Sequence, residues 1–129
     1  RALSQKAGAL SVERSKGSAA LKIMTEQARK FMLQNRSLLI FPEGTRTPAF
    51  NEGRYLPGIY AIAQNFPDVS VIPAAINSGA FWPSKKPILR SGEIILEFLP
   101  PMDNGLSRKE FMSALKEKIE NKTRELEVE

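Results

Sequence analysis

The feature that most constrains the fold is an apolar run that ends in a proline-glycine turn. Residues 37–41 read Ser-Leu-Leu-Ile-Phe, and the next five residues are Pro42, Glu43, Gly44, Thr45 and Arg46. A short apolar run bounded by turn residues predicts a strand in the interior of a sheet. Proline has no amide hydrogen and therefore ends the strand ladder. Glycine lets the backbone come close to a ligand. The sequence therefore predicts a buried strand followed by a ligand-binding loop.

The loop carries an arginine that suits a phosphate group. The planar fork of Arg46 matches two phosphate oxygens, and ligands of open α/β sheets bind beyond the carboxyl ends of strands. Arg14 follows another predicted strand, residues 8–12. Because the ends of successive parallel strands share one edge, we expect Arg14 and Arg46 to converge on one phosphate monoester. Glu43 either orients an arginine or accepts a hydrogen bond from a sugar-like hydroxyl. The structural alternative is a surface ion pair worth about 0–1 kcal/mol.

Three segments show the spacing of amphipathic helices. From residue 18 to about 35, apolar side chains recur every three or four positions, with Ser18 as the expected N-cap. A second helix is predicted from Pro57 to about Asn65, because proline suits the first turn. Ser107 and Glu110 predict a capping box that opens a third helix. The apolar side of that helix carries Phe111, Leu115, Ile119 and Leu126.

Two further segments are rich in β-forming residues. Residues 69–76 contain Pro73, which predicts an edge position, a bulge or a strand end, and residues 93–99 predict another strand. The aromatic residues of the intervening loop, residues 77–92, either contact a membrane interface or acyl chain or cap the edge of the core. Strands that alternate with helices predict a single α/β domain with a mostly parallel sheet and flanking helices.

Composition excludes several classes of mechanism. The 129 residues contain no histidine and no cysteine, so an imidazole base, a thiolate nucleophile and a disulfide are all excluded within them. No apolar run approaches the ~18 residues of a membrane span. A dinucleotide-binding fingerprint and a Walker loop are absent from the sequence. No sequence pattern indicates a metal or a cofactor.

The positive charge is concentrated in the first third of the chain. Residues 1–36 contain eight of the 19 basic residues and two of the 14 acidic ones. Such a surface suits anionic lipid, a phosphorylated ligand or nucleic acid, or it is simply a solvated helix face. The aromatic residues do not alternate with the basic ones, which argues against a base-stacking surface. We therefore expect no nucleic-acid partner.

The motif at residues 41–46 resembles the third signature block of the glycerolipid acyltransferases, in particular those that act on lysophosphatidate. Residues 8–14 resemble the second block, and residues 71–76 resemble the fourth, an apolar stretch around a proline. The order and spacing of the three blocks agree, and the similarity extends through residues 98–101 into the last helix. The resemblance identifies residues 1–129 as a partial acyltransferase domain, incomplete at its N-terminus, with the second to fourth blocks and the C-terminal helix.

The resemblance implies transfer of an acyl group from acyl-CoA or acyl carrier protein to lysophosphatidate, giving phosphatidate. It places the acyl donor beside Ile72 and Pro73, and it implies no cofactor or metal. It also implies a membrane-surface partner on the cytoplasmic face, with peripheral attachment or an anchor that precedes residue 1, whereas the 129 residues alone are expected to be soluble. The positions that match the phosphate- and glycerol-binding residues are Arg14, Glu43, Gly44, Thr45 and Arg46.

The sequence departs from the family pattern at the catalytic block. The family's first block is a histidine that removes the hydroxyl proton and an aspartate, four residues further on, that orients it. This sequence has no histidine, so the resemblance places that pair before Arg1. Glu13 replaces a more usual aspartate, and Leu56 stands where relatives often have lysine. Our hypothesis is that these residues supply the acceptor-binding half and are inactive alone. The alternative is a non-catalytic module that binds phosphate or anionic lipid.

Overall fold

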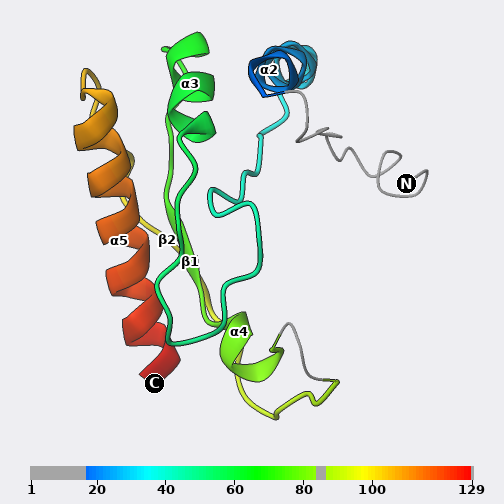
Figure 1. Ribbon diagram of the computed structural model, residues 1–129, viewed down its shortest axis with the longest axis vertical. Helices are drawn as coiled ribbons and strands as arrows, with labels where there is room; N and C mark the ends of the chain where they lie inside the picture. Colours follow the sequence, from blue (N-terminus) through cyan, green and yellow to red (C-terminus); the bar gives the residue numbers. More distant parts are fainter. Residues whose placement is uncertain (1–16, 84–86, 129) are drawn as a thin grey trace. The chain divides into compact units, whose positions relative to one another are not determined.

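The computed structural model describes residues 17–83 and 87–128 (Figure 1). The chain divides into two compact units, Arg1–Ile40 and Phe41–Glu129. The described part of the first unit contains one helix, α2 (Ser18–Met32). The predicted strand at residues 8–12, together with Glu13 and Arg14, lies outside the described residues. The elements of the second unit are α3 (Gly58–Asn65), β1 (Ala74–Ile76), α4 (Ser78–Phe81), β2 (Leu96–Phe98) and α5 (Arg108–Val128).

Helix α2 confirms the first predicted helix. The N-cap is Gly17 with φ 49°, a left-handed conformation that glycine adopts without strain, so the predicted cap at Ser18 is wrong by one residue. The helix buries one side and exposes basic side chains such as Lys22 and Lys30 on another. A turn ending at Asn35 follows the helix. The buried side consists of Ala20, Thr25 and Ala28.

The interior strand predicted at residues 37–41 does not form. The segment has no regular secondary structure, and Leu39 and Phe41 are 75% and 72% exposed. A strand is stable only where a neighbouring strand pairs with its amide and carbonyl groups. Within residues 17–83 and 87–128, no other strand pairs with this segment. The prediction of a buried strand is therefore wrong for the structure as described.

The sheet is antiparallel rather than parallel. Strands β1 and β2 pair with Ala75 opposite Glu97, and a further hydrogen bond of 2.8 Å runs from the amide of Leu99 to the carbonyl of Pro73. Pro73 directly precedes β1, which confirms a strand end. Parallel pairing needs a crossover connection, whereas the described residues between β1 and β2 (77–83 and 87–95) form only the single turn of α4. The parallel sheet that we predicted is thus not found in the described residues, although the combination of helices and sheet is.

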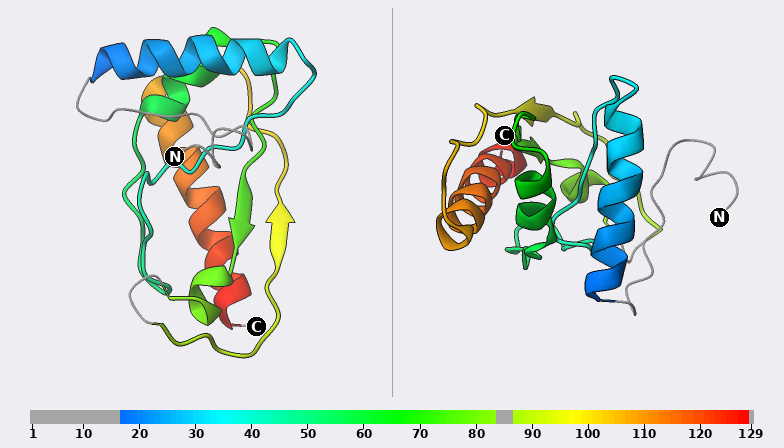
Figure 2. Two further views of the ribbon diagram at one scale, coloured as in Figure 1. Left: turned by 90° about the vertical axis from the view of Figure 1, so that its right-hand side faces the viewer. Right: turned by 90° about the horizontal axis from the view of Figure 1, so that it is seen from above.

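Helix α5 packs against β1 and α3 and builds the core with them (Figures 1 and 2). Phe111, Leu115 and Met102 form the buried cluster, and the rings of Tyr60 and Phe111 lie 5.5 Å apart. The amide of Glu110 donates a 3.2 Å hydrogen bond to the hydroxyl of Ser107, which confirms the Ser107 half of the predicted capping box. The helix predicted from Pro57 is confirmed as α3.

Asn77 ties the sheet to the end of α5. This side chain is 2% exposed and follows β1 directly. Its Nδ2 donates to the carbonyl of Leu126, and its Oδ1 accepts from the amide of Ile95 at 2.8 Å. A buried amide must satisfy both donor and acceptor, and here the two ends bind different elements.

None of the helices in the described ranges combines the length and apolar character that a membrane span requires.

Candidate functional site

The candidate site begins with a tight turn. The amide of Gly44 donates a 3.1 Å hydrogen bond to the carbonyl of Phe41, which closes a β-turn around Pro42 and Glu43. Proline is favoured at the first central position of such turns and glycine at the last. Gly44 has φ 64°, in the left-handed region where glycine carries no steric penalty. The turn thus follows from local sequence, even though the strand before it does not form.

Thr45 and Arg46 follow the turn as exposed residues. Within the ranges that the structure describes, the guanidinium of Arg46 has no ion-pair partner. Its expected companion, Arg14, lies outside those ranges, so the convergence of the two arginines stays a prediction. The structure therefore presents one arginine fork next to a glycine turn.

The carboxylate of Glu43 is held inside its own loop. The hydroxyl of Thr47 donates a hydrogen bond to Glu43 Oε2. Gly53 packs directly on this carboxylate, since a Cβ at position 53 would overlap it. The described residues include no arginine paired with Glu43, so the ion pair we considered is not observed there. The geometry fixes the position of Glu43 through Thr47 and Gly53.

The residues expected beside the acyl donor, Ile72 and Pro73, lie directly before β1. Ile72 is 52% exposed, whereas Pro73 is buried. Neighbouring residues of an extended segment point to opposite sides, which explains the contrast. The carbonyl of Pro73 accepts a hydrogen bond from the amide of Leu99, which directly follows β2.

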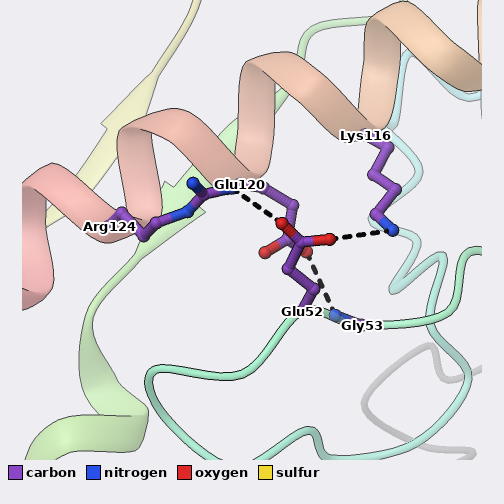
Figure 3. A network of polar contacts seen from close by, with 5 residues as sticks. All are labelled: Glu52, Gly53, Lys116, Glu120 and Arg124. Carbon is purple, nitrogen blue, oxygen red and sulfur yellow. Dashed lines mark hydrogen bonds and ion pairs between the residues drawn. The ribbon is translucent and has the colours of Figure 1, made fainter.

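No sequence pattern predicted a buried carboxylate on α5 that contacts the same loop. Glu120 is 9% exposed, and its Oε1 accepts a 3.3 Å hydrogen bond from the amide of Gly53 (Figure 3). The hydroxyl of Tyr55 also hydrogen-bonds to Glu120. Burial raises the pKa of Tyr55 well above its usual range, and the negative charges of Glu120 and Glu43 raise this pKa further. Tyr55 therefore stays protonated at neutral pH and donates its hydrogen bond.

Ion pairs join the same loop to α5 on either side of Glu120. The carboxylate of Glu52 lies 3.3 Å from Lys116 Nζ and 2.9 Å from Arg124 Nη2 (Figure 3). The amide of Phe50 donates to Glu127 Oε2 at 3.0 Å. These helix residues are spaced four, four and three positions apart, a pattern that puts them on one face. That spacing is visible in the sequence. Residues 105–129 contain equal numbers of positive and negative charges, however, so nothing in the sequence indicated that one face of the helix binds the loop.

No group of three or more histidine, cysteine, aspartate or glutamate residues within the described ranges is arranged to hold a metal ion. The described site is a set of hydrogen-bonding and ionic groups. It consists of an arginine, a glycine turn and two carboxylates that lie near one tyrosine.

Comparison with known proteins gives two findings. Residues 1–77 match the model of a family described as Acyltransferase. A stretch of 74 residues is 36% identical to the 1-acyl-sn-glycerol-3-phosphate acyltransferase of Pseudomonas aeruginosa, and it covers 57% of this chain and 28% of that protein. The chain thus spans little more than a quarter of this curated relative. No solved structure matches the chain.

Proposed function

The chain belongs to the acyltransferase family, and we propose that it forms the acceptor-binding part of a lysophosphatidate acyltransferase. In the proposed reaction, the hydroxyl of lysophosphatidate attacks the thioester of acyl-CoA or acyl carrier protein. A new ester bond forms, the carbon–sulfur bond breaks, and phosphatidate and the free thiol are the products. The name of the relative from Pseudomonas aeruginosa supports this choice of acceptor.

The observation that carries the proposal is the exposed Arg46 directly after the Gly44 turn. A guanidinium fork binds phosphate oxygens through two charge-assisted hydrogen bonds. We assign the acceptor phosphate to Arg46 and Thr45, with Arg14 as a second arginine. Because Glu43 is negatively charged, it repels phosphate, and we assign it to a glycerol hydroxyl of the acceptor.

Acyl transfer to a hydroxyl also requires a base for the hydroxyl proton. The sequence contains no histidine, and the raised pKa of Tyr55 keeps this side chain protonated. We therefore propose that the base comes from outside these residues and that they catalyse no turnover alone. The assay incubates the purified 129-residue chain with lysophosphatidate and radiolabelled acyl-CoA or acyl carrier protein. Labelled phosphatidate above the protein-free rate would overturn this part of the proposal.

Acceptor binding is tested by isothermal titration of the chain with lysophosphatidate below its micellar concentration. Replacing Arg46 by alanine is expected to weaken binding by about 10- to 100-fold, the effect of losing hydrogen bonds to a charged group. Arg90→Ala is the matched control. Arg90 is exposed and lies outside the motif, and its replacement by alanine removes the same charge. Equal affinities for Arg46→Ala and the wild type would contradict the assignment.

A second candidate is a non-catalytic module that binds anionic lipid. The absence of histidine and the exposed Lys22 and Lys30 on α2 favour it. Such a module would bind phosphatidylserine vesicles through general charge attraction. In that case Lys22→Gln combined with Lys30→Gln abolishes vesicle binding, and Arg46→Ala has no larger effect than Arg90→Ala. The acyltransferase proposal expects Arg46→Ala to be selectively impaired towards lysophosphatidate.

A further inference from the structure

Helix α5 contacts the loop at residues 42–56 from beyond the part of the chain that matches the family. The match ends at residue 77, whereas α5 begins at Arg108. Glu120 is the buried member of this contact, at 9% exposure. Burying a carboxylate costs free energy unless donors satisfy it. The amide of Gly53 and the hydroxyl of Tyr55 are those donors.

The contact reaches the candidate site through Gly53. Its amide donates to Glu120 on one side, and its Cα lies against the Glu43 carboxylate on the other. The position of Gly53 therefore determines the space that Glu43 occupies. Thr47 holds the same carboxylate from within the loop.

The ion pairs on either side of Glu120 are weaker than the hydrogen bonds to its carboxylate. Glu52 pairs with Lys116 and Arg124, and all three side chains are substantially exposed. Exposed ion pairs are weak because water screens both charges, whereas a hydrogen bond to a buried charge is among the stronger polar contacts of a protein. Glu120 therefore dominates the attachment of this loop to α5.

We propose that Glu120 is a positioning residue for acceptor binding. It holds Gly53 in place, and Gly53 keeps the Glu43 carboxylate where it meets a glycerol hydroxyl of the acceptor. The inference rests on the proposed function and deepens it, because it adds a residue of α5 to the recognition of the glycerol part. It also separates two components of affinity, since the phosphate is bound by Arg46 and the hydroxyl by Glu43.

The test measures the affinity of the 129-residue chain for lysophosphatidate and for dodecyl phosphate, which has the phosphate but no glycerol. Glu120→Ala is expected to weaken lysophosphatidate binding about tenfold, the effect of losing one hydrogen bond to a charged group. The affinity for dodecyl phosphate stays unchanged. Glu120→Gln keeps an acceptor oxygen for Gly53 and is expected to remain within about threefold of the wild type. Glu117→Ala is the control, because Glu117 is an exposed glutamate on the same helix.

Amide exchange at Gly53 and denaturant unfolding are measured on each variant. If Glu120→Ala does not fold, Glu120→Asp replaces it, since this variant keeps the charge but withdraws the carboxylate by one methylene. Faster exchange at Gly53, selective loss of lysophosphatidate affinity and recovery by glutamine support the inference. Wild-type affinity for lysophosphatidate in Glu120→Ala, or in Glu120→Asp where it replaces that variant, overturns the inference and leaves the proposed function standing. A wild-type chain that binds dodecyl phosphate and lysophosphatidate equally also overturns it, and a wild-type chain that binds neither overturns both.

Discussion

The two halves of α5 stabilise the second unit in different ways. The first half contributes Phe111 and Leu115 to the apolar cluster around Met102. The second half contributes one buried apolar side chain, Leu126, and otherwise contacts the loop at residues 42–56 through charged groups such as Glu120. Apolar packing is strong and has little directional preference, whereas hydrogen bonds to charges are weaker but fix geometry. One helix thus builds the core at one end and positions a candidate binding loop at the other.

The largest effect is expected in the apolar half. Phe111→Ala removes a ring that is 5% exposed and should lower the free energy of unfolding by about 3–5 kcal/mol, as measured by urea denaturation. Lys109→Ala, at an exposed position two residues earlier on the same helix, is the control. A loss of less than about 1 kcal/mol would show that the first half of α5 does not build the core.

A smaller effect on stability, but a large effect on binding, is expected at the contact between loop and helix. Gly53→Ala places a Cβ on the Glu43 carboxylate, which should cost about 1–3 kcal/mol and weaken lysophosphatidate binding. Both quantities are measured, by denaturation and by titration calorimetry. Gly79→Ala is the matched control, because a Cβ there lies 3.6 Å from the Cβ of Ala49, an ordinary contact. Equal behaviour of the two variants would argue against the close approach of Gly53 and Glu43.

Tyr55 provides a pH test of the same contact. The pKa of Tyr55 is raised in the folded chain by burial and by Glu120, whereas an unfolded tyrosine ionises near pH 10. The stabilisation is therefore complete below about pH 10 and is lost as the pH rises above it. Between about pH 10 and 11, the wild type should lose more stability than Tyr55→Phe, by less than the ~1.4 kcal/mol of one full pKa unit because solvent screens the half-buried hydroxyl. Denaturation curves that fall in parallel for the two proteins would contradict this burial.

The smallest effect is expected for the exposed ion pairs. Lys116→Gln removes one partner of Glu52, leaves Arg124 in place and should cost about 0–1 kcal/mol at low salt. The cost should disappear in about 1 M salt, because exposed charges are screened there. If Lys116→Gln lowers the free energy of unfolding by more than about 1.5 kcal/mol and this loss persists in high salt, the ion pairs rather than Glu120 attach the loop to α5.

Local features were predictable from the sequence. Helices α2, α3 and α5 follow from apolar spacing, and the Ser107 cap and the Gly44 turn follow from short motifs. Each depends on residues a few positions apart, so the physics that forms it is contained in a short window.

Features that depend on distant partners were not predictable. Residues 37–41 have the composition of a buried strand, but composition does not supply a neighbouring strand to pair with. The antiparallel sheet depends on the connection between β1 and β2. Glu120 lies 67 positions from Gly53, and only the tertiary structure brings the two together.

The most direct test of the attachment between α5 and the loop is a nuclear Overhauser measurement on the isotopically labelled 129-residue chain. We expect cross-peaks between the ring protons of Tyr55 and the side-chain methylenes of Glu120, together with slow exchange of the Gly53 amide. A Tyr55 ring without cross-peaks to Glu120, with a Gly53 amide that exchanges at the rate of an unstructured peptide, would show that the loop is not attached to α5 in this way.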